Sequence, residues 1–312
     1  MKYKIWLANI AGVVIFACYV WYIVNNWDKL KPITTIPFEI FGAIVLCILL
    51  TWLLNSTQSY YLLNAQGIRI GFSEIFLLYS ACTFVNYLPF RFGTILRFHY
   101  LKTAHSLTYT RAISVTSVRA VILIYSAGML GLLGTLGVFW SHGHFSLQLI
   151  VFFSLMVILP TVAACCPLPR IYSAKNKFYN IWNDFVDGFG MLRSQPWITL
   201  KVMLVLFCQL ICVALRFFFC FQVLDLQPSL FVLLLLAPVS VLTMLISLTP
   251  GGIGLREALM GYLTFATGSD FSDGIITGTI DRAMLLFVTL FVGSVGLIYL
   301  WCRYRKQTAV NL

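Results

Sequence analysis

Six apolar stretches, each long enough to cross the hydrocarbon core of a bilayer, constrain this chain more than any other feature. A transmembrane helix needs about 20 mainly apolar residues. The stretches that meet this requirement are Ile5–Val24, Pro37–Leu54, Arg119–Trp140, Phe145–Cys166, Trp197–Val223 and Thr279–Trp301. Apolar residues make up 60% of the chain and charged residues only 10%, which leaves too little polar surface for a water-soluble fold. We therefore predict an all-α polytopic membrane protein, with residues 1–312 forming a single transmembrane domain.

Two further apolar stretches are interrupted by proline and glycine. One ends in Pro89-Phe-Arg-Phe-Gly93, and the other contains Pro250-Gly-Gly-Ile-Gly254. Non-helical backbone is tolerated at membrane depth only inside protein or beside a watery cavity, because an unpaired amide costs several kcal/mol in hydrocarbon. We expect each stretch to form a re-entrant helical hairpin with its tip near the midplane. The predicted tip residues are Pro89, Gly93, Pro250, Gly251, Gly252 and Gly254.

A shift of 161 residues, the separation of Pro89 and Pro250, relates the two halves of the chain. The same shift brings residues 36–63 onto 197–224, an apolar span in each case. An arginine follows each interrupted stretch at similar spacing, Arg119 in the first half and Arg282 in the second. Transporters are often built from repeats of inverted topology. We predict such an inverted repeat, with its first copy at about residues 36–140 and its second at about 197–301.

The basic residues predict how this repeat is oriented, because cytoplasmic loops are rich in lysine and arginine. If both interrupted stretches are hairpins, 13 basic residues share one side with both termini, and only Lys29 and Lys31 lie on the other. We therefore expect a multi-pass protein of the cytoplasmic (inner) membrane with cytoplasmic N- and C-termini. Residues 170–195 combine aromatic with charged side chains at three- and four-residue spacing, which predicts an amphipathic connector on the cytoplasmic face.

Charged side chains gather beside both predicted tips. A charge at the bilayer centre costs from a few to more than ten kcal/mol, so each needs a partner. Five arginines face only two nearby acids, which leaves an excess of positive charge that a phosphate headgroup would neutralise. The predicted substrate-binding residues are Asn86, Arg91, Arg97, Arg119, Arg256, Glu257, Asp281 and Arg282. In the alternative interpretation, Arg97 reaches the interface and Arg282 pairs locally with Asp281. Arg216, inside an apolar span, is interpreted as structural.

The other polar residues do not form a pattern typical of catalysis. The nine cysteines have no paired spacing, and His142 and His144 have no carboxylate beside them. A lipid phosphatase would need a histidine together with a phosphate-binding basic set, and none of the four histidines has that company. We therefore expect a protein that is not an enzyme and that uses no metal or cofactor and binds no nucleic acid. The oligomeric state stays open.

Two motifs carry a resemblance to a known family. They are Asn86-Tyr-Leu-Pro-Phe-Arg-Phe-Gly-Thr-Ile-Leu-Arg97, followed by Arg119, and Thr249-Pro-Gly-Gly-Ile-Gly-Leu-Arg-Glu257, followed by Arg282. At these residues the chain resembles the flippase-like family named for the transmembrane region of lysylphosphatidylglycerol synthase. The resemblance implies a membrane protein that carries aminoacylated phosphatidylglycerol or polyprenyl-linked sugars across the bilayer. Bifunctional members have a cytosolic aminoacyl-transfer domain, which does not follow Leu312, so we expect a separately encoded enzyme to modify the lipid.

The chain departs from the family pattern at three positions. Phe90 stands where the family often has glycine, while Thr94 and Val118 stand where it often has an acid. The first hairpin therefore lacks negative charge, which favours a plain anionic headgroup over one that bears lysine. We expect a translocase for an anionic phospholipid or a polyprenyl-linked lipid. The alternative is a proton-coupled exporter of a small anion, which would also place arginines at a broken helix.

Overall fold

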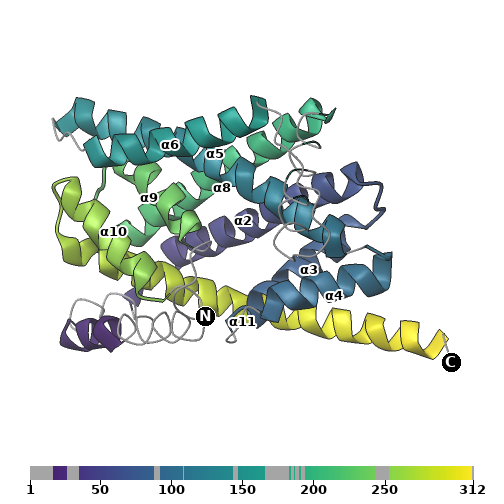
Figure 1. Cartoon of the computed structure of the whole chain (residues 1–312). Helices are drawn as coiled ribbons and strands as arrows, with labels where there is room; N and C mark the ends of the chain where they lie inside the picture. Colours follow the sequence, from purple (N-terminus) through teal and green to yellow (C-terminus); the bar gives the residue numbers. More distant parts are fainter. Residues whose placement is uncertain are drawn as a thin grey trace.

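A computed structural model of the chain (Figure 1) describes residues 17–26, 35–87, 92–107, 109–142, 147–165, 183, 186, 190, 194–243 and 253–310. The regular secondary structure of these residues is helical. Among these residues, five helices are long and apolar enough to cross a membrane: α2 (Phe38–Ala65), α5 (Tyr109–His142), α6 (Leu147–Cys165), α8 (Pro196–Gln222) and α11 (Phe271–Val310). They correspond to five of the six predicted spans, and the prediction of an all-α polytopic membrane protein is confirmed.

Several predictions fall outside the described residues. They concern the start of the first apolar stretch, Ile5–Val24, and most of the connector 170–195. They also concern Pro89, Arg91, Pro250, Gly251 and Gly252 at the two tips.

Helix α2 shows why these segments form membrane helices with polar interiors. Its leucines at positions 46, 50 and 53 share one exposed face, whereas Thr51, Asn55 and Gln58 share a buried one. Both sets recur at three- and four-residue spacing, which places each on a single face of a helix. The Thr51 hydroxyl donates to the Cys47 carbonyl at 2.7 Å, so it is satisfied within the helix. An apolar outer face and a polar inner face suit a helix whose outer solvent is lipid.

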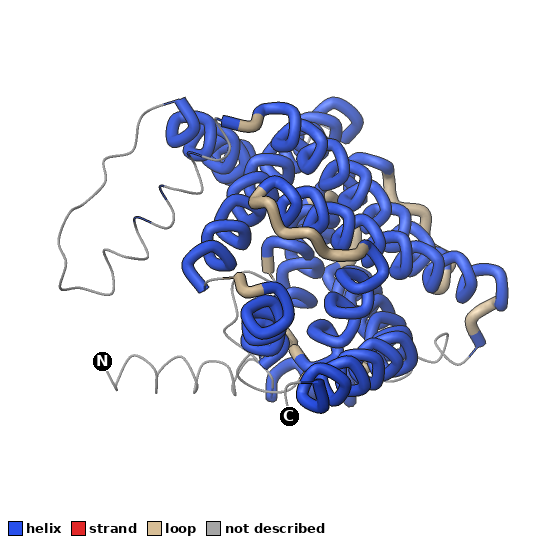
Figure 2. Tube along the Cα trace, turned by 90° about the vertical axis from the view of Figure 1, so that its right-hand side faces the viewer, coloured by secondary structure: helices blue, strands red, loops and turns tan. Residues whose placement is uncertain are grey.

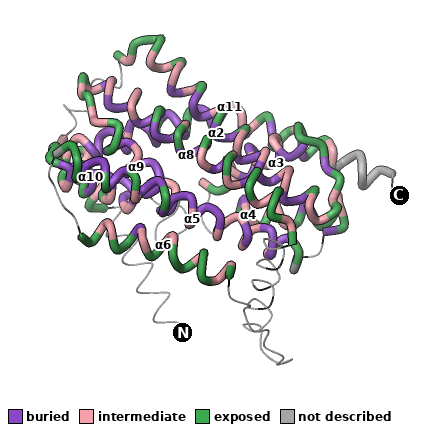
Figure 3. Tube along the Cα trace, turned by 90° about the horizontal axis from the view of Figure 1, so that it is seen from above, coloured by how far each residue is buried: buried purple, intermediate pink, exposed green. Residues whose placement is uncertain are grey.

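Two pairs of shorter helices lie where the sequence predicts the hairpins. The first pair is α3 (Phe72–Val85) and α4 (Phe92–His105), and the second is α9 (Leu230–Leu242) and α10 (Leu255–Ala266). A helix of this length extends only about 20 Å, less than the bilayer core of about 30 Å. The first pair lies at one end of the long helices and the second pair at the opposite end (Figures 1 and 3).

Helices of the first half of the chain pack on helices of the second half. Helix α2 packs along α8, α3 packs on α11, and α9 packs on α5. A shift of 161 residues carries α2, α3, α4 and α5 approximately onto α8, α9, α10 and α11. Gln195, just before α8, donates from Nε2 to the carbonyl of Ala65 at the end of α2, at 3.4 Å, so α2 and α8 run antiparallel. Each hairpin therefore packs on the last long helix of the other half.

Glycine residues allow the helices of the two halves to approach closely where they pack. A Cβ atom at Gly134 of α5 would lie 2.9 Å from the backbone nitrogen of Leu235 in α9. A Cβ atom at Gly296 of α11 would lie 2.6 Å from the carbonyl oxygen of Leu77 in α3. Glycine at helix contacts inside membranes allows backbones to approach in this way.

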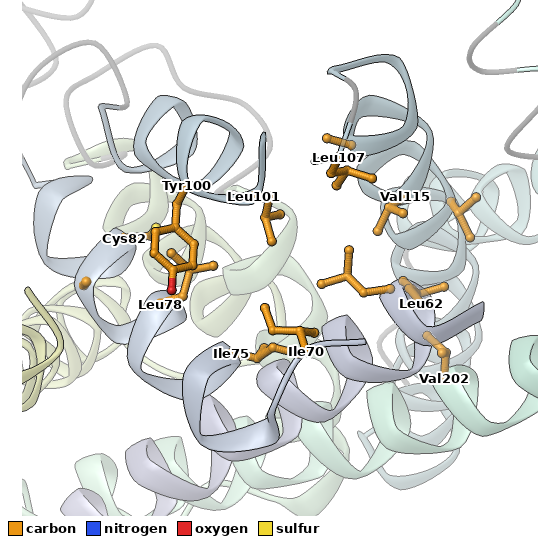
Figure 4. Close-up of a cluster of buried hydrophobic side chains, with 14 of the residues drawn as sticks. Leu62, Ile70, Ile75, Leu78, Cys82, Tyr100, Leu101, Leu107, Val115 and Val202 are labelled. Carbon is orange, nitrogen blue, oxygen red and sulfur yellow. The ribbon is translucent and has the colours of Figure 1, made fainter. Parts of the chain in front are cut away.

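Buried apolar side chains fill the spaces between the helices in three clusters. The cluster in Figure 4 joins the first hairpin to α2, α5 and α8, and includes Leu62, Leu78, Leu101, Val115 and Val202. The end of the bundle that carries this hairpin faces the viewer in Figure 2. On the outside, α6 packs on α5 and is otherwise mostly exposed. The charged side chains described next therefore lie among tightly packed helices.

Candidate functional site

One buried carboxylate links three helices of the second half. Asp281 on α11 is fully buried and forms ion pairs with Arg216 on α8 and Arg256 on α10. Nη2 of Arg256 contacts Oδ2 of Asp281, and Nη2 of Arg216 lies 3.4 Å from the same oxygen. Both guanidinium groups also lie over the ring of Phe217, 5.5 Å from its centroid for Arg256 and 5.9 Å for Arg216. The three charges and the ring fix α8, α10 and α11 relative to one another.

A second acid joins α10 to α11 and caps α10. Nε of Arg282 lies 2.8 Å from Oε1 of Glu257. The other oxygen of Glu257, Oε2, accepts a hydrogen bond from the backbone N–H of Gly254 at 2.7 Å. Gly254 has a φ of +88°, in a region that side chains other than glycine rarely adopt. The turn into α10 thus depends on this glycine, and Glu257 both satisfies its N–H and binds Arg282.

In the first half, arginines lie beside neutral side chains. Nη2 of Arg119 on α5 donates to Oδ1 of Asn55 on α2, and Nδ2 of Asn55 donates to the Thr51 carbonyl at 3.2 Å. Arg97 lies on α4, which packs against α5, and its positive charge acts electrostatically on Arg119. No acid among the residues that the structure describes forms an ion pair with Arg97 or Arg119. This half therefore carries an excess of positive charge.

The two helices of the first hairpin touch at Gly93. A Cβ atom at this position would lie 2.0 Å from the carbonyl oxygen of Cys82 and 2.6 Å from Oδ1 of Asn86. Asn86 ends α3 and is itself exposed. Gly93 thus serves a close approach between α3 and α4, whereas Gly254 serves a turn with positive φ.

The structure brings the predicted site residues together in two groups. Arg256, Glu257, Asp281 and Arg282 form one group, and Arg97 and Arg119 form the other, while Asn86 lies near Gly93 at the hairpin turn. Arg216, interpreted from the sequence as structural, belongs to the first group. The sequence interpretation also missed Asn55. The sequence signal for Asn55 was a polar residue within the apolar stretch of α2, because an amide at membrane depth needs a hydrogen-bond partner.

A further polar network joins the start of α3 to the end of α4, at the mouth of the first hairpin. Oε1 of Glu74 on α3 accepts from the Tyr100 hydroxyl at 2.7 Å and lies 2.7 Å from Nε2 of His105, both on α4. Nη1 of Arg303, near the C-terminal end of α11, lies 2.7 Å from Oε2. Burial raises the pKa of Glu74, but the hydrogen bonds from these three side chains outweigh it and hold that pKa below its usual range. The network places the mouth of this hairpin and the end of α11 on the same side of the protein.

The described residues contain no group of three or more histidine, cysteine, aspartate or glutamate side chains placed to hold a metal ion. The arrangement instead offers guanidinium groups packed among the long apolar helices, and their chemistry suits an anion.

Comparisons with known proteins give one match. A family model described as the transmembrane region of lysylphosphatidylglycerol synthase matches residues 9–293, a range that includes both hairpins and both groups of arginines. No curated protein and no solved structure matches the chain.

Proposed function

The chain belongs to the family of lysylphosphatidylglycerol synthase transmembrane regions, and from that premise we propose that it is a lipid translocase rather than an enzyme. Its family is linked to the handling of membrane lipids. The proposed substrate is an anionic phospholipid or a polyprenyl-linked lipid of the cytoplasmic membrane, and a separate protein would modify that lipid. Both termini would then face the cytoplasm, with the first hairpin opening to the same side.

The observation that carries this proposal is that Arg97 and Arg119 form no ion pair with any acid in the described part of the chain. At membrane depth the described part of the chain has five arginines, at positions 97, 119, 216, 256 and 282, and two acids, Glu257 and Asp281. Both acids pair with arginines of the second half, so the excess of three positive charges includes Arg97 and Arg119. The oxygen of Asn55 accepts a hydrogen bond but supplies no negative charge.

A phosphate group supplies what this pair lacks. It carries one or two negative charges and accepts hydrogen bonds at several oxygens, and the planar guanidinium group matches that geometry with two parallel donors. The cost of holding two repelling arginines at membrane depth would be offset whenever a headgroup lies between them. A binding site that is favourable only with its ligand present suits a carrier of that ligand.

The same charges weigh against a proton-coupled exporter. Such a carrier needs a side chain, most often a carboxylate, that takes up and releases a proton during transport. The two described acids at membrane depth are both held by arginines, Asp281 by two of them and Glu257 by one. Lipid transport needs no such carboxylate.

Transport in proteoliposomes tests the proposal. Fluorescent phosphatidylglycerol should cross the bilayer faster with the wild-type protein than without protein. Arg97→Gln and Arg119→Gln should each lower the rate about tenfold or more, since a hydrogen bond to a charged group contributes about 1.5–3 kcal/mol. Lys at either position should restore part of the rate, because it keeps the charge but loses the bidentate fork. Lys201→Gln is the matched control, since Lys201 is an exposed cation near the start of α8, apart from both groups of arginines.

Two outcomes would overturn the proposal. If the wild-type protein moves none of the tested lipids above the protein-free rate but takes up radiolabelled phosphate, the chain is a small-anion exporter. If both arginine variants transport at the rate of the control, these two residues do not bind the headgroup.

A further inference from the structure

The two groups of arginines are built from equivalent helices. We call Asn55 on α2, Arg97 on α4 and Arg119 on α5 the first site, and Arg216 on α8, Arg256 on α10 and Asp281 on α11 the second site. The repeat shift carries α2 onto α8, α4 onto α10 and α5 onto α11. It carries position 55 onto position 216 and brings positions 97 and 119 within two residues of positions 256 and 281. Each site thus takes one polar side chain from each of three corresponding helices.

The sites differ in the charge of the side chain that contacts their arginines. The first site has two arginines and a neutral amide, and no acid from the described part of the chain. The second site has two arginines and the fully buried carboxylate of Asp281. The second site therefore already contains an anion, and that anion belongs to the protein.

The second site also contains an N–H group that donates no hydrogen bond to the described residues. Nε of Arg256 is buried and has no hydrogen-bond partner among the residues that the structure describes. A carboxylate presents two oxygens, whereas a phosphomonoester presents three non-bridging oxygens, so such a phosphate in the place of Asp281 would accept this additional bond.

The two sites lie close together along the α2–α8 pair. Nε2 of Gln58 on α2 donates to Oε1 of Gln209 on α8 at 2.5 Å, which fixes the register of these antiparallel helices. From that contact, Asn55 lies three residues toward the start of α2, and Arg216 lies seven residues toward the end of α8. Because these are the same direction, the two residues are offset by four residues, or about 6 Å along the helix axis. One turn of helix separates the sites along this axis.

We propose that the second site is a further anion-binding station, which the phosphate of a headgroup enters by displacing Asp281 from between Arg216 and Arg256. This inference rests on the proposed function, because the same headgroup would arrive from the first site. Asp281 acts as a built-in competitor that prevents the headgroup from being trapped at the second site. A site on a transport path must bind its ligand weakly enough to release it.

Binding stoichiometry in detergent, measured by native mass spectrometry with a short-chain phosphatidic acid, tests this inference. Wild-type protein should retain one equivalent of the lipid, because Asp281 fills the second site. Asp281→Asn should retain two equivalents. The charge-balanced variant Arg216→Gln/Asp281→Asn, which loses one positive and one negative charge, should again retain one. The same titration with inorganic phosphate shows whether the acyl chains are needed.

The outcomes separate this inference from the proposed function. If wild-type protein binds one equivalent and folded Asp281→Asn also binds one, the second site is no anion station, although the first site stands. Suppose that the double variant Arg97→Gln/Arg119→Gln binds as much lipid as wild type, and that Asp281→Asn still adds one equivalent. The first site is then refuted and the second stands. If inorganic phosphate binds with the same stoichiometry and the lipid does not, the ligand is a free anion.

A transport measurement decides the matter if Asp281→Asn does not fold. Arg216→Gln/Asp281→Asn keeps the net charge of the second group. If Asp281 and Arg216 only hold the helices together, this double variant should be less stable, but its folded fraction should transport lipid at close to the wild-type rate. By the present inference, its transport should fall at least tenfold while one equivalent of lipid still binds at the first site. Recovery of transport would overturn the inference.

Discussion

Gly93→Ala should force apart the two helices of the first hairpin, because the structure leaves no space for a methyl group at this position. The added Cβ atom would lie 2.0 Å from the backbone carbonyl oxygen of Cys82. Real Cβ atoms essentially never come within 3.0 Å of a non-bonded heavy atom, so α3 and α4 must separate by about 1 Å. The same carbonyl accepts the hydrogen bond from the N–H of Asn86, at 2.9 Å, that closes the last turn of α3.

The expected cost follows from these two contacts. Overpacking a tightly packed site costs about 1–3 kcal/mol. Loss of the hydrogen bond to the Cys82 carbonyl would leave a polar group unsatisfied, which costs a further 1–3 kcal/mol or so. The free energy of unfolding should therefore fall by about 2–6 kcal/mol. Gly42→Ala is the matched control, because Gly42 is an exposed glycine of α2 and its added Cβ would have no atom within 4 Å. This variant should be more stable than wild type by about 0.5–1 kcal/mol.

Equilibrium unfolding in mixed micelles of a mild detergent and dodecyl sulfate measures the difference between the two variants. Lipid transport by the folded fraction of each variant then reports whether the hairpin contact is needed for function. If Gly93→Ala is as stable as Gly42→Ala, the close approach of α3 and α4 at this point is refuted.

Two further predictions concern the ends of the molecule. The hydrogen bonds to Glu74 hold its pKa below the usual value near 4.5 despite burial. They therefore stabilise the folded state above that pH. This stabilisation is lost as the pH falls through the lower pKa of the folded state. The free energy of unfolding of wild type should accordingly fall more between about pH 5 and pH 3 than that of Glu74→Gln, and parallel curves would show that the network contributes nothing. In a protein without native cysteines, an impermeant thiol reagent should label Asp270→Cys from outside the cell and Lys102→Cys only from inside. Both positions are exposed; Lys102 is in α4 and Asp270 follows α10, and these two helices lie at opposite ends of the bundle (Figure 1). Labelling of Lys102→Cys from outside would contradict the predicted orientation.

The sequence by itself determined five of the six predicted spans and the positions of the two interruptions. A membrane helix must satisfy its own backbone and face lipid with apolar side chains, and both requirements are local, so hydropathy along the chain reveals them. Proline and glycine near Gly93 and Gly254 marked where this regularity ends for the same reason. The sequence also identified Arg256, Glu257, Asp281 and Arg282 as a set, because charges are scarce in such a chain and stand out.

Only the tertiary structure decided which charges pair. Arg216 and Asp281 are 65 residues apart, and Arg119 and Asn55 are 64 apart. Their contacts depend on how α8 and α2 are rotated about their axes and packed against α11 and α5, which no local spacing specifies. For the same reason the sequence could count an excess of arginines but could not say that Asp281 neutralises Arg216 and Arg256 while Arg97 and Arg119 lie beside neutral side chains. The difference between a filled and an unfilled anion site exists only once the helices are packed.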